Sequence, residues 1–397
     1  MCHLFFHNKK MPLNDDDVHR IASLLPFDER HQLTHVSKQF ERVLSTRCAL
    51  WDTDATFFIK DASIAESCVA WMSRRRYFRS LHVHFDLVDE MAFAAFLGAL
   101  SVVSRGLKIL LISAPHLKFE DPLFLGSCDS LLALHVDARS MKLSDFACRA
   151  LSKTLADLHL HVTGGTLFPL PHLDMSAMRS ISITSKSNAA WRVFEKGATF
   201  PRVQKVSLRF APYSTILHVM KNMQSITSLS LKQCNLVELP DHLSALTSLK
   251  NLRVSHNSLV SLANLPETVT RLDVSHNCLA ESDIGTRTPI QILDISCNTD
   301  ISRPDTMILP NLKYISCSSI PTHAFFTAST QLHTINIHAR CHGYERDAQT
   351  PSVPMGLHTT ATALFIEPNS KGFLGVDMCR EMLALVRSNP RLDVSFS

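Results

Sequence analysis

The same eight-residue pattern, Leu-x-Val-Ser-His-Asn-x-Leu, begins at Leu252 and again at Leu272. Two flanking segments follow variants of this pattern: "LSLKQCNL" from Leu229 and "LDISCN" from Leu293. Each copy alternates apolar and polar residues, which is typical of a short strand with one buried face. No copy is long enough to bury its apolar face alone. The copies must therefore stack on one another into a shared core.

The same frame extends in both directions and gives fourteen apolar anchor positions. Their spacing runs from 20 residues (Leu252 to Leu272) to 29 (Leu81 to Leu110). The anchors are Leu81, Leu110, Leu134, Leu158, Ile181, Val206, Leu229, Leu252, Leu272, Leu293, Ile315, Ile335, Leu364 and Leu392. Period and pattern resemble those of leucine-rich repeat proteins. This resemblance implies an α/β fold over residues 78–397, a leucine-rich repeat solenoid of about fourteen repeats with a parallel sheet on its concave face. The alternative is an unrelated α/β fold with coincidental strand spacing.

Asparagines follow the central strands at the point where the chain turns away. Their amides can satisfy backbone groups of the neighbouring turn, so we expect Asn257, Asn277 and Asn298 to stack as a ladder. Cys234 takes the same place one repeat earlier, an exchange that the repeat pattern allows. The short central intervals leave no room for long helices, which we expect instead near 89–103 and 376–388.

The first residues have helical instead of strand periodicity. Asn14 can cap a helix with acidic residues in its first turn. Val18, Ile21 and Leu25 fall on one face of this helix, and Pro26 ends it. Two further short helices follow. Three such helices cannot bury a large core, so the unit is expected to rest on a partner.

This segment resembles an F-box, a motif that the order Leu13, Asp15, Ile21, Leu25-Pro26, Asp28, Leu33, Val36-Ser37-Lys38-Gln39-Phe40 and Leu50-Trp51 follows. It departs from the motif at Asn14, where a proline is usual, and at Arg30 and His31, where leucines are usual. The resemblance implies a three-helix unit over 1–51 (core 13–51), a linker or cap over 52–77 and the repeats over 78–397. The residues implied to bind the Skp adaptor, or to hold the helices together, are Leu13, Val18, Ile21, Leu25, Pro26, Leu33, Val36, Phe40 and Trp51.

The combination of the two resemblances implies a substrate receptor of an SCF-type ubiquitin ligase. Its partners would be the Skp adaptor with its cullin complex and an unknown protein substrate. Two alternatives stay open. One is an F-box protein that acts with the adaptor alone, and the other is a repeat scaffold whose N-terminal helices only cap the first repeat.

Composition sets the remaining limits. A net charge of +4 over 397 residues gives no reason to expect a nucleic-acid or membrane partner. The 11 cysteines are scattered without a C-x-x-C pair, so we expect reduced thiols. The apolar run in "MCHLFFHNKK" is too short for a signal peptide. The expected compartment is the cytoplasm, the nucleus or both.

No sequence pattern predicts an enzyme, a cofactor or a metal site. Glycine-rich phosphate loops, G-x-S-x-G and paired cysteines are absent from the sequence. Five histidines fall on outward strand positions: His82, His84, His135, His159 and His161. Leu111 and Ser113 interrupt them and no carboxylate is expected beside them, which favours a polar binding surface over a transition-metal site.

Basic residues mark the outward strand positions of the central repeats. They are Lys205, Arg209, Lys232, Arg253 and Arg271, and they lie among serines with Asp273 and Asp294 following. Arginine forks pair well with carboxylate and phosphate, so this strip fits an acidic or phosphorylated peptide. An ordinary solvated strand face is the alternative.

Overall fold

The computed structural model describes residues 55–73, 78–120, 123–164, 166–167, 175–194, 199–280, 289–298, 307–318, 325, 328–338, 363–367 and 393–396. The chain divides into two compact units, Met1–Leu173 and Asp174–Ser397. Every residue predicted to bind the adaptor, from Leu13 to Trp51, lies outside the described residues, as does the helix expected near 376–388. Among the described residues, no helix has both the length and the apolar content needed to cross a bilayer.

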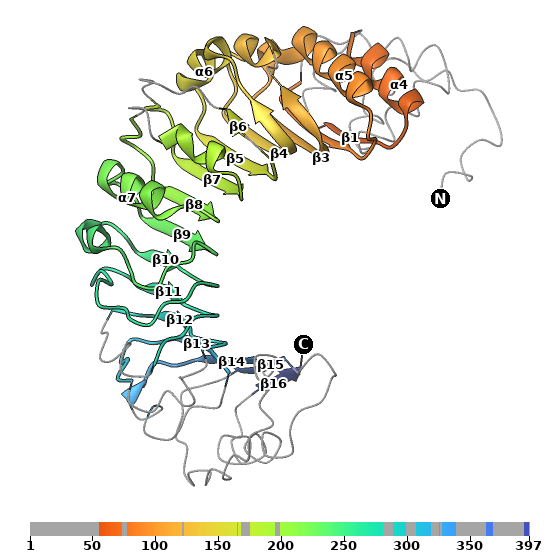
Figure 1. Ribbon diagram of the computed structural model, residues 1–397. Coiled ribbons are helices and arrows are strands. Elements are labelled where there is room, and N and C mark those ends of the chain that lie inside the picture. The colour runs from red at the N-terminus through yellow and green to blue at the C-terminus, as the bar shows by residue number, and fades with distance from the viewer. Residues whose placement is uncertain are drawn as a thin grey trace, which may run out of the picture. The chain divides into compact units, whose positions relative to one another are not determined.

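Parallel strands form the first unit, with helices along one side of them (Figure 1). The strands β1 (Ala55–Ile59), β2 (Ser80–Phe85), β3 (Ile109–Glu120), β4 (Ala133–Lys142) and β5 (Asp157–Val162) pair in chain order, and β6 (Thr166–Leu167) pairs with the end of β4. The connections contain α4 (Ala62–Ser73), α5 (Glu90–Val103), η2 (Ser104–Gly106), η3 (Leu123–Ser127) and α6 (Asp145–Ser152). The helix expected over 89–103 is confirmed as α5.

The strand register follows the predicted anchors. Leu81, Leu110, Leu134 and Leu158 pair in one row across β2 to β5, and all four are buried. Ala55 on β1 extends the same row upstream of Leu81. Part of the segment expected to be a linker therefore forms a strand and a helix of the repeat type, and the sheet begins one strand earlier than the anchor series.

The second unit continues the pattern with shorter strands. These are β7 (Ser180–Ser185), β8 (Lys205–Arg209), β9 (Ser228–Lys232), β10 (Asn251–Arg253), β11 (Arg271–Asp273), β12 (Ile292–Asp294), β13 (Tyr314–Cys317), β14 (Thr334–His338), β15 (Ala363–Glu367) and β16 (Asp393–Phe396). Between them the described residues contain η4 (Asn188–Phe194), α7 (Tyr213–Asn222) and η5 (Asp241–Ala245). The expected lack of long helices in the central repeats is confirmed for the described residues from β9 to β13.

The anchors from Ile181 to Leu364 pair in one row through this unit, from β7 to β15. The last anchor was predicted wrongly. Val394, and not Leu392, pairs with Leu364, because β16 begins only at Asp393. The alternating pattern "LDVSF" offers three apolar positions in the same phase, so the alternation alone does not distinguish them.

Aromatic packing supports the helices of the first unit. Asp89 caps α5, since its Oδ1 accepts hydrogen bonds from the backbone N–H groups of Met91 (2.9 Å) and Ala92 (3.0 Å). The helix thereby places Phe93 edge-on to Phe85 of β2, with ring centroids 5.0 Å apart, and 6.3 Å from Phe119 of β3. All three rings are buried. Aromatic pairs of this kind add about 0.5–1.5 kcal/mol beyond the area that they bury.

The asparagine ladder is confirmed. Nδ2 of Asn277 donates to the carbonyls of Val254 in the preceding repeat (3.0 Å) and Val274 in its own (2.9 Å). Its Oδ1 accepts from the backbone N–H of Leu259 (3.0 Å). Asn257 and Asn298 repeat these contacts one repeat before and after. Each amide therefore joins two successive repeats. Cys234 bonds more weakly, through its Sγ to Leu208 O at 3.6 Å.

A column of left-handed residues follows the central strands. Phe210, Gln233, His256, His276 and Cys297 have φ between 54° and 64°, and each lies four residues after its anchor. The backbone N–H groups of His256 and His276 donate to Ser275 O (2.9 Å) and Ser296 O (2.8 Å) of the following repeat. The left-handed bend thus turns each N–H toward the next repeat. It is uncommon for non-glycine residues and unfavourable for a bulky one such as Phe210.

The cysteines match the expected reduced state only in part. Cys68, Cys128, Cys148, Cys234, Cys278 and Cys317 are free, and Cys297 is disulfide-bonded. Burial raises the pKa of the Cys68 thiol to about 11, and burial, with Asp129 adding to it, raises that of Cys128 to about 12. Such thiols stay protonated at neutral pH and act as apolar core groups.

The ladder predicts a specific cost for losing one amide. Asn277→Ala leaves Val254 O, Val274 O and Leu259 N–H buried without this partner, so we expect unfolding to require about 3 kcal/mol less free energy. Urea denaturation followed by circular dichroism measures it. The control is Asn222→Ala on α7, an exposed asparagine that donates only to His218 O of its own helix. Equal unfolding midpoints for the two variants would contradict a stabilising ladder.

Candidate functional site

Two rows of polar side chains cross the sheet of the first unit on the face opposite its apolar core. One row runs through His82, Leu111, His135 and His159 on β2 to β5. The other runs through His84, Ser113, Asp137 and His161 on the same strands. We call these two rows the histidine face. The face results from strict alternation along each strand. The anchor and the residue two positions after it are buried, so the residues one and three positions after the anchor point to the opposite side.

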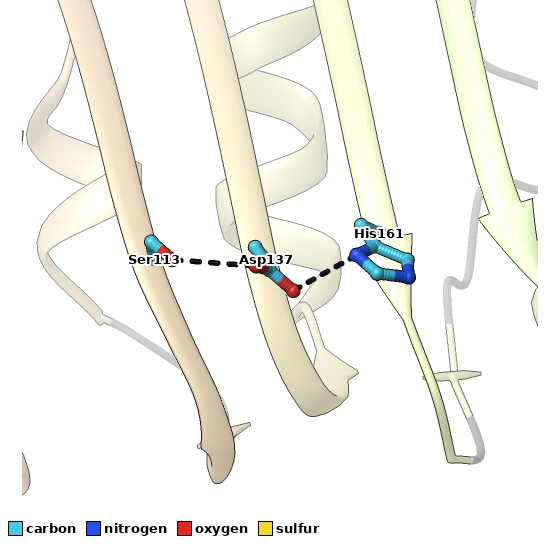
Figure 2. A network of polar contacts seen from close by, with 3 residues as sticks. All are labelled: Ser113, Asp137 and His161. Carbon is cyan, nitrogen blue, oxygen red and sulfur yellow. Dashed lines mark hydrogen bonds and ion pairs between the residues drawn. The ribbon is translucent and has the colours of Figure 1, made fainter. Parts of the chain in front are cut away.

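Three side chains of the second row contact one another across three adjacent strands (Figure 2). Ser113 Oγ donates to Asp137 Oδ2 (3.3 Å), and His161 Nδ1 lies 3.1 Å from Asp137 Oδ1. The carboxylate lies between the hydroxyl and the imidazole. A serine nucleophile needs the imidazole between the two, to take the hydroxyl proton. The order Ser113–Asp137–His161 therefore fits a positioned polar surface and not a nucleophilic triad.

The histidine face is hollowed. A hollow of about 300 Å³ is lined by both rows, with His84, His135, His159 and His161 around its rim and Leu111 among its apolar lining. The His135 and His159 rings lie 5.2 Å apart. Beside it, the His84 ring stacks on Phe58 of β1 at 4.9 Å, and Phe58 is 57% exposed. Exposed aromatic and imidazole rings beside a hollow are the kind of surface that binds a side chain of another protein.

Electrostatics favour the neutral form of two of these histidines. Burial lowers the pKa of His135, with His82 lowering it further and Asp157 raising it. Burial also lowers the pKa of His159, as do His135 and His161, while Asp137 raises it. At neutral pH both rings are therefore uncharged and present a polar surface of low charge.

The five predicted histidines do lie together, but the prediction of their neighbours was incomplete. We expected no carboxylate beside them, and Asp137 lies among them in contact with His161. The sequence does not single out Phe58, because β1 falls in the segment expected to be a linker or cap. The signal for Asp137 was its place three residues after the anchor Leu134, which matches His161 after Leu158. Among the described residues, no group of three or more His, Cys, Asp or Glu is arranged to hold a metal ion.

The basic strip of the central repeats is spread over three rows of the sheet. Lys205 and Arg271 lie in the row before the anchors, Arg253 lies one position after, and Arg209 and Lys232 lie three positions after. Arg209 and Lys232 are paired neighbours on β8 and β9. Arg253 is paired with Asp273 instead. Only the two neighbours therefore form a purely basic pair.

No protein-family model matches the chain, and no curated protein matches it. Among solved structures, an internalin (inlF) from Listeria monocytogenes str. 4b F2365 matches with a TM-score of 0.39 and 14% sequence identity, covering 89% of this chain and 92% of that one. The strand register and the asparagine contacts of the chain itself define the repeat architecture.

We expect the melting temperature to depend on pH through His135 and His159. Their pKa values are lower in the folded state than the ordinary value near 6.5, so the unfolded chain takes up protons first as the pH falls. The stability that neutral rings contribute is complete above pH 6.5 and is lost below it. We expect His135→Gln with His159→Gln to reduce the fall in melting temperature between pH 7.5 and pH 5.

The control for this experiment is His242→Gln, an exposed histidine on η5. It should leave the pH dependence of the melting temperature as in the wild type. A double variant whose melting temperature falls as steeply as that of the wild type would show that these rings titrate alike in both states.

Proposed function

We propose that the protein is a non-enzymatic binding protein whose strand faces hold a protein partner. The observation that carries this proposal is the histidine face, where both rows and the exposed Phe58 present side chains from five adjacent strands beside one hollow. Repeats that stack in register place such side chains in columns, and these columns form a broad surface suited to protein recognition. The contacts of Ser113, Asp137 and His161 hold polar groups in place without the order that catalysis needs.

The finer proposal is a substrate receptor of an SCF-type ubiquitin ligase. Its support is the sequence order from Leu13 to Trp51, which resembles an F-box and precedes the repeats directly. In this proposal the N-terminal helices bind the Skp adaptor through Leu25, Pro26 and Val36, and the repeats bind the substrate. An apolar helical face docking on a partner's helices is a common mode of recognition.

A repeat scaffold without adaptor binding is the second candidate. Strand β1 gives the N-terminal helices a role in this candidate, because β1 is the first strand in the sheet order and pairs only with β2 among the described strands. An edge strand of this kind needs cover against association with other chains. Helices placed just before it in the sequence would serve as that cover whether or not they bind an adaptor.

Adaptor binding separates the two candidates. Burying a leucine or valine side chain contributes about 1.5–3 kcal/mol, so Leu25→Asp with Val36→Asp should cost about 3–6 kcal/mol of binding. That raises the Kd of the complex with the Skp adaptor by about 10²- to 10⁴-fold. Isothermal titration of the purified full chain with purified adaptor measures the change.

The matched control is Val237→Asp with Val260→Asp, two exposed valines of the repeats that are 55% and 48% exposed. It introduces the same charges and should leave adaptor affinity unchanged. A folded wild-type chain that does not bind the adaptor would reject the ligase proposal in favour of the scaffold. If the chain co-purifies from cells with the adaptor but without a cullin, it is an F-box protein that acts outside ubiquitination.

A further inference from the structure

A basic and aromatic cluster lies where β7, β8 and β9 of the second unit end. It consists of Lys186, Arg209, Phe210 and Lys232, with His256 beside it. We propose that this cluster, the phosphate cluster, binds a phosphorylated side chain of the protein partner. The inference rests on the proposed binding function and narrows its ligand to one chemical class.

Two cations share one aromatic ring in the cluster. Lys186 Nζ lies 5.2 Å and Arg209 Cζ 5.0 Å from the centroid of the Phe210 ring. Phe210 has a φ of 64°, a conformation that is rare for a bulky residue. The equivalent residues of the next four repeats share this conformation, so it belongs to the repeat and fixes where the ring stands at the end of β8. Both cations therefore lie within cation–π distance of the same ring.

Arg209 is held by a second contact. Its Nε donates to Gln233 Oε1 at 2.7 Å, which leaves the terminal guanidinium nitrogens for another acceptor. Lys232 is its paired neighbour on β9, at the strand spacing of about 4.8 Å. Among the described residues, no carboxylate lies within ion-pair distance of Lys186, Arg209 or Lys232. The cations thus lack a counter-ion of their own in this part of the chain.

The local potential at His256 agrees with this arrangement. Burial lowers the pKa of His256 most, and His276, Lys232 and Arg209 lower it further, while Asp273 raises it. The His256 and His276 rings stack with centroids 4.0 Å apart. An anion placed among these groups would offset the repulsion between them.

The surroundings favour one compact dianion over a polyanion. The positions that follow Arg209 and Lys232 in their row are the buried serines Ser255 and Ser275. In a neighbouring row, Asp273 and Asp294 carry negative charge on β11 and β12. A nucleic-acid backbone that ran across the strands from β8 towards β12 would meet these carboxylates. A phosphorylated side chain carries about two charges on one group and pairs well with a guanidinium fork beside an ammonium.

The test uses the full chain and two fluorescein-labelled peptide pools, identical except that one fixed position is phosphoserine or serine. Fluorescence anisotropy should give an apparent Kd at least about tenfold lower for the phosphoserine pool, a difference of about 1.4 kcal/mol. Arg209→Glu with Lys232→Glu should remove this preference. Arg209→Gln with Lys232→Gln, a milder change at the same positions, should reduce it in the same direction while circular dichroism stays unchanged.

The matched control is Lys205→Glu with Arg271→Glu, which changes the net charge equally on the row before the anchors. Lys205 lies four residues from Arg209 on one strand, about 13 Å away, beyond the screening length of about 8 Å at physiological salt. This control should keep the phosphoserine preference within about twofold of the wild type.

Two results would overturn the proposal. One is equal affinity of the wild-type chain for both pools, and the other is equal loss in the two glutamate variants, which would indicate nonspecific charge attraction. Adaptor binding by the Arg209→Glu, Lys232→Glu variant should match that of the wild type. The failure of the phosphate cluster is therefore distinguishable from the failure of the ligase proposal.

Discussion

The repeat architecture depends on how the backbone is satisfied where each turn leaves its strand. Strands of three residues, such as β10, β11 and β12, offer few ladder hydrogen bonds of their own. The asparagine amides supply the missing partners, because one side chain bonds carbonyls of two successive repeats and an N–H of the preceding turn. A buried backbone group left without a partner costs about as much as a lost hydrogen bond. In the central repeats, from β9 to β12, these contacts tie each strand to the next and so help to fix the positions of their outward side chains.

Much of the fold was predictable because its determinants are local and recur. The anchors, the ladder and the helix α5 follow from alternation, from one amide per turn and from the length of the connection. Strand β1 was missed because "ATFFI" has apolar residues in both phases and so lacks the alternation that marks the other strands. The last strand was misplaced by two residues because "LDVSF" is apolar at three positions of the same phase.

For the candidate sites, the sequence predicted which residues lie on the outward strand face, but not which side chains contact one another. The sequence placed the histidines on one face, but the contact between Asp137 and His161 depends on the pairing of β4 with β5. Likewise, the basic strip looked continuous along the chain. The register divides it, since Arg253 faces Asp273 while Arg209 and Lys232 face each other. These pairings follow from the distance of each residue to its predicted anchor, whereas the side-chain contacts also depend on rotamers, which the repeat pattern does not specify.

The left-handed column after the central strands has an energetic consequence. Glycine enters this conformation freely, whereas other residues do so at a cost of about 1 kcal/mol or more. The chain nevertheless has phenylalanine, glutamine, two histidines and a cysteine at these five positions, and only 11 glycines in all. Phe210 and Gln233 contact neighbouring cations, and His256 and His276 stack on each other. The backbone therefore carries a conformational cost at these five positions, and the result is a row of side chains with fixed positions along the repeats.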